Sequence, residues 1–292
     1  CNYCISFKER CLPFIDKAAS GKAREYLEKK IEDIKLSGKG KAYDCIIGLS
    51  GGVDSSYVAY QVKKLGLNPL AVHFDSGWNS EIAVKNIENI VKKLNIDLFT
   101  HVCDWEEMKD LQLAFFKSSV PNCDIPTDHA FVAVLYNAAL KHGIKYIISG
   151  SNLATESVLP TAWGHAAIDL KHLKDIQRKY GNLKLKKYPK IGFLKRYFYC
   201  SFIKGIKEFK ILDFMEYNKN TAKKIIQDEL DWKDYGGKHY ESVFTKFFQS
   251  YYLPVKFGYD KRRAHLSSLV LSGQISREDA LKEMKTLPYQ EE

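Results

Sequence analysis

The sequence lacks any long run of apolar residues. Hydrophobic residues make up 45% of its 292 positions, but no stretch reaches the ~18 consecutive apolar residues typical of a transmembrane helix, and no signal peptide opens the chain. A regular cysteine framework is also missing. The seven cysteines are an odd number and are widely scattered, which favours reduced thiols and a cytoplasmic protein. A chain of this length can bury a sizeable core, and we expect one main domain with appendages.

Two common phosphate-binding motifs are absent as well. The sequence contains no G-x-x-x-x-G-K-[ST] loop, and no G-x-G-x-x-G follows its first predicted strand. That strand, residues 45–49, instead leads into Ser-Gly-Gly-Val-Asp-Ser at 50–55 and then into a helical pattern that stops at Gly66. Such a turn is a natural phosphate cradle, because glycines let backbone N–H groups approach an anion and the helix N-terminus adds further donors.

The S-G-G-x-D-S motif resembles the signature of the PP-loop ATP pyrophosphatases, which cleave ATP between its α and β phosphates and pass AMP to an oxygen. The resemblance implies ATP as the nucleotide and Mg²⁺ as its counterion. Asp54 would bind the magnesium ion and take part in catalysis. A carboxylate beside a triphosphate repels it unless a cation lies between the two negative groups. The leaving pyrophosphate would be held by Ser50, Gly51, Gly52 and Ser55.

The pattern further along the chain predicts an α/β fold with a doubly wound parallel sheet. Strands are expected at 45–49, 70–75, 98–102 and 146–149, with helices at 22–36, after Gly52, around 87–94, at 105–117 and at 128–141. Ligands of such sheets bind beyond the carboxyl ends of the strands. That rule places four residues on the adenosine side of the site: His73, Asp75, Gly150 and Ser151.

We predict three regions: a cysteine-containing segment with a helix at 1–40, the ATP-binding α/β domain at 41–170, and a basic, mainly helical part at 171–292. Ser276 to Asp279 predicts a capping box for the last helix, and Gly273 the stop of the helix before it. Between Lys171 and Lys210 the net charge is +11, so the remaining residues sum to −1.

This basic segment fits either a solvated helix face or a surface for an anionic substrate, nucleic acid, acidic protein or membrane. Its interleaved aromatic residues disfavour a purely solvated face, because they need something to pack against. Their near-helical spacing favours packing on a protein over stacking on RNA bases. We therefore expect this segment to dock a partner protein or to guard a substrate entrance.

Over about residues 1–288 the chain resembles the N-acetyl sugar amidotransferases of bacterial surface-polysaccharide and flagellin-glycan biosynthesis. Matching stretches are HFDSGWNS at 73–80, IPTDHAF at 125–131, GSNLATE at 150–156, YGGKHYES at 235–242, FGYDKRRAHL at 257–266 and SGQISRE at 272–278. The resemblance implies conversion of a sugar acetamido group, nucleotide-linked or sialic-acid-like, into an acetamidino group. It also implies ATP, and ammonia from a glutaminase–cyclase pair of the imidazole-glycerol-phosphate-synthase type. On this resemblance, the basic segment would dock the protein that supplies ammonia or guard the sugar entrance.

Several polar residues of these stretches are candidates for chemistry, although each alone could equally be a helix cap or a surface charge. For catalysis or proton transfer we name Asp128 and Glu156, with Asp169 as a further candidate. For binding the sugar or its anionic group we name Trp78, His129, Lys238, His239, Arg262 and Arg263.

The cysteines bear on the source of ammonia, on metal binding and on the choice between alternative functions. None lies in a G-x-C-x-G elbow, and only 43 residues precede the first strand, so we expect a separate glutaminase to supply ammonia. Cys1 and Cys4 read as half of a zinc site, and since the chain begins without methionine, its first residues are expected to be missing. A sulfur-carrying pair would instead indicate a tRNA thiolase or a similar tRNA-modifying PP-loop enzyme. Besides the sugar amidotransferase and the tRNA-modifying enzyme, the remaining alternative for this chain is a non-catalytic nucleotide-binding scaffold.

Overall fold

A computed structural model describes residues 1–237 and 240–289. Within these residues, five strands form one parallel sheet in the order β3-β2-β1-β4-β5. The strands are β1 (Cys45–Gly48), β2 (Pro69–Asp75), β3 (Asp97–Val102), β4 (Tyr146–Ser149) and β5 (Lys207–Lys210). The chain runs outward from β1 to β3 and then returns to the other side of β1, so the topological switch point lies between β1 and β4.

Helices cover both faces of the sheet, as the predicted doubly wound fold requires. One face packs against α3 (Arg24–Gly38), α4 (Val53–Lys64), α5 (Glu81–Leu94) and α10 (Lys219–Leu230), and the other against α6 (Trp105–Ser118), α7 (Ile125–His142), α9 (Leu170–Tyr180) and the π-helix η2 (Leu194–Ile203). Side chains alternate across a strand, so Ile46 enters the core beneath α7 and Ile47 the core beneath α4. Each is fully buried and contributes about 1.5–3 kcal/mol to stability.

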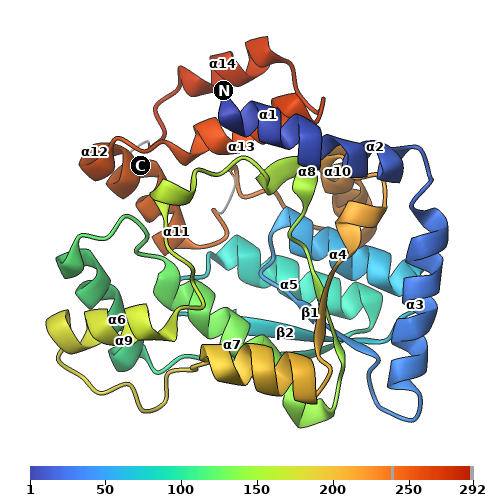
Figure 1. Cartoon of the computed structure of the whole chain (residues 1–292), viewed down its shortest axis with the longest axis horizontal. Helices are drawn as coiled ribbons and strands as arrows, with labels where there is room; N and C mark the ends of the chain where they lie inside the picture. The colour runs from blue at the N-terminus through green and yellow to red at the C-terminus, as the bar shows by residue number, and fades with distance from the viewer. Residues whose placement is uncertain (238–239, 290–292) are drawn as a thin grey trace.

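The first helix of the chain lies close to helices of the C-terminal part (Figure 1). The N-terminal helix α1 (Asn2–Arg10) lies beside α13 (Lys261–Leu271), which also contacts the short helix α8 (Leu153–Glu156). The second helix, α2 (Leu12–Ala19), contacts α1 and the 3₁₀ helix η3 (Ile211–Phe214). The remaining elements are η1 (Thr161–Trp163), α11 (Val243–Phe247), the π-helix η4 (Phe248–Tyr252), α12 (Leu253–Phe257) and α14 (Arg277–Met284). Among the helices described, none is long and apolar enough to cross a membrane.

The helical character of the C-terminal part is confirmed. Of the predicted capping box the structure shows the N-cap bond: Ser276 Oγ accepts a hydrogen bond of 3.0 Å from the Asp279 backbone N–H. The basic segment also holds β5, which the sequence analysis missed. That strand reads Lys-Glu-Phe-Lys, and Phe209 is its one buried residue, so its pattern carries little hydrophobic signal. Pairing with β4 brings it into the sheet, past the predicted boundary at residue 170.

Two carboxylates of α6 hold the basic loop at residues 181–192 against the domain. Glu107 accepts hydrogen bonds from the backbone N–H groups of Lys186, Lys187 and Tyr188, at 2.8–3.1 Å. One turn away, Asp110 accepts from residues 182 and 183 in the same way. Burial alone would raise the pKa of the Glu107 carboxyl, but these three N–H groups outweigh burial and lower the pKa below its usual value.

Glu107→Gln should lower the free energy of unfolding at pH 7 by about 1–3 kcal/mol, because the amide NH₂ would face backbone donors in a buried site. Because the pKa of Glu107 is depressed in the folded state, its stabilisation is complete above the unfolded-state pKa near 4.5 and is lost as the pH falls through the lower folded-state value. Denaturant unfolding at pH 7 and pH 3 measures both effects. Glu106→Gln, at the exposed neighbouring position, is the control and should change stability by less than about 0.5 kcal/mol. Equal effects of the two variants would contradict this account.

Candidate functional site

The loop between β1 and α4 is shaped by two close backbone contacts. Gly51 has φ +79°, and a Cβ at this position would lie 2.6 Å from the Ala83 carbonyl oxygen of α5. At the end of the neighbouring strand β4, a Cβ on Gly150 would lie 3.2 Å from the Asp54 carbonyl carbon. Gly51 therefore requires glycine, and Gly150 leaves little room for a side chain. The ends of β1 and β4 meet at the switch point, where doubly wound sheets bind ligands.

Hydroxyl groups line the inside of this loop. The Oγ atoms of Ser50 and Ser55 are 3.1 Å apart, and the Gly52 backbone N–H donates to Ser50 Oγ at 3.3 Å. The next N–H, that of Val53 at the start of α4, donates to the Tyr235 hydroxyl at 3.3 Å. These backbone donors at a helix N-terminus form the kind of site that binds phosphate.

Residues from the far end of the chain hold the loop from outside. Trp232 is buried and donates from Nε1 to the Gly51 carbonyl at 2.8 Å. The Tyr217 hydroxyl donates to Oδ1 of Asp54 in the first turn of α4. Burial, followed by the charge of Asp54, raises the pKa of Tyr217 well above its usual value, so this hydroxyl remains a donor. Tyr217 thus orients the carboxylate of Asp54, which the sequence analysis predicts to bind magnesium.

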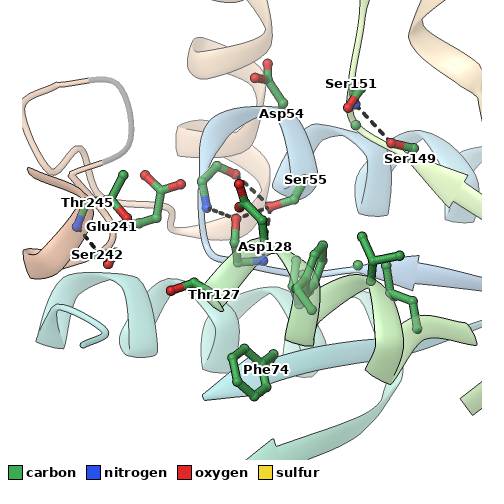
Figure 2. Close-up of a pocket in the computed structure, with 18 of the residues that line it drawn as sticks. Asp54, Ser55, Phe74, Thr127, Asp128, Ser149, Ser151, Glu241, Ser242 and Thr245 are labelled. Carbon is green, nitrogen blue, oxygen red and sulfur yellow. Dashed lines mark hydrogen bonds between the residues drawn. The ribbon is translucent and has the colours of Figure 1, made fainter. Parts of the chain in front are cut away.

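The loop opens into a cavity of about 580 Å³. Its walls come from the ends of β1, β2 and β4, from one face of α7, and from Glu241 to Lys261 in the C-terminal part. Figure 2 shows Ser55, Asp128 and Glu241 around this space, with Asp54 projecting from the start of α4. Segments that are far apart in sequence therefore share one cleft.

Acidic groups gather on the α7 side of the cavity. Asp124 is buried and accepts a hydrogen bond from Thr245 Oγ1 at 2.9 Å. The Asp128 side chain is accessible to water from the cavity but lies deep within the protein. This enclosure, followed by the charges of Asp124 and Glu156, raises the pKa of Asp128 to about 7, although Lys261 acts in the opposite direction. Asp128 can therefore exchange a proton near neutral pH.

The structure brings nine of the sequence-predicted site residues to this cavity. Those that line it are Ser50, Gly52, Asp54, Ser55, His73, Asp128, Gly150, Ser151 and Glu156. His73 is buried, with Nδ1 2.8 Å from the Leu49 carbonyl and Nε2 3.1 Å from Asn79 Nδ2. Burial lowers the pKa of His73, and both ring nitrogens already have partners. The ring therefore supports the cavity wall as a neutral group.

Other predicted residues do not line the cavity; they stabilise the surrounding structure. Asp75 accepts from Gly77 N and Asn79, and Trp78 donates to Gln112. His129 is buried, between the Ala167 carbonyl and the Ile191 N–H, while Asp169 caps α9. Arg262 pairs with Asp260 and bonds the Thr286 carbonyl near the end of α14. Arg263 is exposed.

The zinc site that the sequence predicted at Cys1 and Cys4 receives no support. The two sulfur atoms are 3.4 Å apart on α1, but in residues 1–237 and 240–289 no group of three or more His, Cys, Asp or Glu side chains could hold a metal ion. Zinc needs four ligands, so this pair alone does not fit it. Lys238 and His239, predicted to bind substrate, lie outside the described residues.

Sequence reasoning missed six residues of the site: Asp124, Tyr217, Lys219, Tyr235, Glu241 and Lys261. Three of them stand in stretches that carried the family resemblance, at 235–242 and 257–266. In the second stretch the two arginines were chosen, whereas Lys261 is the residue that reaches the cavity. Tyr217 has no comparable signal, because it lies in an irregular segment after η3.

Two family models match the chain. The model described as "NAD synthase" matches residues 23–191, more than half of the sequence. The model described as "LPS biosynthesis protein WbpG-like, C-terminal domain" matches residues 241–292. Together they agree with the sequence-based resemblance, the first over the phosphate loop and the sheet, and the second over the C-terminal helices.

The curated relatives are similar over part of their length. GMP synthase [glutamine-hydrolyzing] of Thermosipho africanus is 33% identical over 164 residues, which are 50% of this chain and 30% of that protein. The tRNA-specific 2-thiouridylase MnmA of Mesomycoplasma hyopneumoniae is 31% identical over 137 residues, 38% of this chain and 37% of the relative. The chain therefore spans only about a third of the curated relatives that it matches.

Solved structures show weaker likeness. An NH3-dependent NAD synthetase from Campylobacter jejuni has a TM-score of 0.35 at 17% identity, covering 54% of this chain and 72% of its own. The U34-tRNA thiolase NcsA of Methanococcus maripaludis has a TM-score of 0.41 at 15% identity, covering 91% and 81%. Similarity at this level distinguishes no function.

Gly51→Ala should destabilise the protein more than Gly40→Ala. The two glycines have nearly the same φ, +79° and +78°, but a Cβ at Gly40 meets nothing within 4 Å. Gly40→Ala therefore measures the cost of the backbone conformation alone, about 1–2 kcal/mol. Gly51→Ala adds the clash with Ala83 and should also abolish ATP binding. Denaturant unfolding and nucleotide titration test this, and equal losses in the two variants would show that the contact with α5 does not matter.

Proposed function

The chain belongs to the NAD synthase family, and we propose that it uses PP-loop ATP chemistry to convert a sugar acetamido group into an acetamidino group. Members of this superfamily use ATP, which agrees with the phosphate loop described here. In the proposed reaction ATP yields AMP and pyrophosphate, and ammonia supplies the new nitrogen. The chain would thus act as an AMP-forming amidotransferase.

One observation carries the sugar assignment. The cavity that holds the phosphate loop is completed by Glu241, Ser242, Thr245 and Lys261, all within the stretch that matches the WbpG-like lipopolysaccharide biosynthesis domain. This domain therefore contributes directly to the space beside the loop, where the second substrate must lie. A sugar-binding role for this wall fits the name of the family that matches it.

The first step activates the amide. An amide oxygen is a poor leaving group, so it first attacks the α-phosphorus of ATP, which forms an O-adenylyl imidate and releases pyrophosphate. Ser50, Ser55 and the N–H groups at the start of α4 hold the departing pyrophosphate. Lys219 and Lys261 line the same cavity and offset its charge. Positioning and charge stabilisation account for most of catalysis in such transfers.

Magnesium fits the chemistry of this site. Asp54 offers a carboxylate in the first turn of α4 and lines the cavity beside the loop, and carboxylates together with phosphate oxygens suit this ion. When bound, Mg²⁺ would offset the negative charge of the triphosphate. Tyr217 contributes by fixing the orientation of Asp54 through its hydrogen bond.

In the second step ammonia adds to the imidate carbon, AMP leaves with the former amide oxygen, and the added nitrogen loses a proton. Asp128 is the residue of the cavity suited to accept that proton, because its pKa lies near 7. In addition to burial, the negative charges of Asp124 and Glu156 raise the pKa of Asp128, and both residues lie on the same acidic side of the cavity. We assign Asp128 as the general base.

A second function is favoured by one comparison, the similarity to a tRNA-specific 2-thiouridylase. A cysteine that carries sulfur must reach the nucleotide as a thiolate. Among the described residues no cysteine lines the cavity. Burial raises the pKa of Cys103 and of Cys123 to about 11, so both stay protonated. These features favour the amidotransferase over the thiolase.

Ammonia would come from a separate glutaminase, docked on the π-helix η2. This helix and the residue before it expose large apolar side chains, with Phe198 57% and Phe202 79% accessible, within the basic segment. Exposed aromatic groups among positive charges fit a partner surface with apolar and acidic character. Phe202→Asp should therefore weaken glutamine-driven turnover while leaving ammonium-driven turnover unchanged.

ATP should be cleaved to AMP and pyrophosphate in the presence of ammonium and an acetamido sugar, with no ADP. Asp54→Asn should reduce this turnover at least about a hundredfold, since the amide cannot replace the carboxylate as a magnesium ligand, yet the variant should fold normally. Chromatography of the nucleotides and mass spectrometry of a panel of UDP- and CMP-linked acetamido sugars measure both products. Asp228→Asn on the exposed face of α10 is the control, and ADP as the product would refute the assignment.

At saturating ammonium, kcat should rise with pH through about 7, because Asp128 accepts a proton only when ionised and its ionised fraction grows over this range. Asp128→Asn should lose both this rise and most of the turnover. Saturation removes the separate effect of pH on free ammonia. A variant that keeps the pH profile of the native protein would exclude Asp128 as the base.

A further inference from the structure

The cavity continues well past the phosphate loop. Between α7 and strands β4 and β5 it extends along Phe131, Leu135 and Ile147 as far as Tyr136 and Glu208. Its α7 wall runs from Asp128 to Tyr136, which at 1.5 Å per residue corresponds to about 12 Å. The open cleft above the loop and this extension are therefore one continuous space with two ends.

The walls of the extension are apolar over most of this length. Leu135 and Ile147 belong to the core beneath α7, and the partly buried Phe131 and Val132 pack against that core. The Phe131 ring lies so close to the sheet that a Cβ on Gly48 would be 2.4 Å from its Cζ. Such walls disfavour ions, because an unpaired charge is costly to bury, but they accept a small neutral molecule.

The outer end lies at the protein surface beneath η2. The Arg196 guanidinium sits 5.2 Å from the centre of the Tyr136 ring and its Nη2 is 3.3 Å from Glu208 Oε2. The Glu208 side chain remains 36% accessible. Arg196 partly covers the outer end and belongs to the same helix as the exposed Phe198 and Phe202, so this end lies beside the apolar surface of η2.

We propose that this extension is a second entrance, through which neutral ammonia reaches the activated carbon. This inference rests on the proposed function. ATP and the sugar must enter through the open cleft above the loop and fill it before ammonia is needed. The nucleophile then requires another route, and the extension leads from the surface to Asp128, which accepts its proton. The species that enters is neutral NH₃, which is present in solution in equilibrium with the ammonium ion.

Side chains that narrow the extension should weaken the use of ammonium and leave the binding and activation of ATP unchanged. Val132→Phe in its wall and Glu208→Trp at its outer end should each raise the KM for ammonium at least about tenfold at constant pH. The KM for ATP should stay unchanged, as should the exchange of pyrophosphate into ATP, which needs the sugar but no ammonia. Leu140→Phe is the matched control, because Leu140 lies on the same helix and is packed on the same core but does not line the cavity.

Three results would overturn the proposal. An unchanged KM for ammonium in both folded variants means that ammonia takes another route. A raised KM for ATP means that the extension holds part of the nucleotide. Failure of the native chain to form AMP in an ammonium-dependent way refutes the proposed function and the second entrance with it. If Val132→Phe does not fold, Glu208→Trp decides, because its position is at the surface.

Discussion

Two backbone segments in direct contact define the centre of this molecule. The Cα of Gly51 lies so close to the Ala83 carbonyl of α5 that no side chain fits between them, and the Gly51 carbonyl accepts the indole N–H of Trp232. This arrangement directs the N–H groups at the start of α4 into the cavity and brings Asp54 within reach of Tyr217. If the loop moved away from α5, the phosphate donors and the oriented carboxylate would be lost together.

The cavity shows why a common ATP-binding scaffold can serve different substrates. The strand ends and the glycine loop provide what ATP chemistry needs, and they lie in the part that matches NAD synthase. The opposite wall, with Glu241, Thr245 and Lys261, comes from the C-terminal helices. Under the proposed function, selection of the second substrate can change through this wall without altering the loop.

Most of the fold could be predicted from the sequence, because its central strands are buried on both faces and read as continuous apolar runs between glycines. β2 is buried at six of its seven positions. β5 escaped prediction because an edge strand of mixed charge carries no such signal, and only its pairing with β4 defines it. The phosphate loop was predictable for a related reason, since the required glycines occupy fixed positions in it.

The rest of the site depends on long-range contacts that local patterns cannot reveal. Trp78 and His129 belong to stretches that resemble the family, yet both are used to hold neighbouring segments together. Asp128 and Glu156 reach the cavity because α7 and α8 begin at the same edge of the sheet. Tyr217 could be recognised only once its hydroxyl was seen beside Asp54.

The side chains that bond to the phosphate loop are synthesised much later than the loop itself. Residues 50–55 leave the ribosome more than 150 residues before Tyr217, Trp232 and Tyr235, a delay of roughly 10–30 s at 5–20 residues per second. During that interval the nascent chain carries a phosphate loop without the three side chains that bond to it. The side chains that fix the loop are therefore synthesised shortly before Glu241 to Lys261, which form the opposite wall of the cavity.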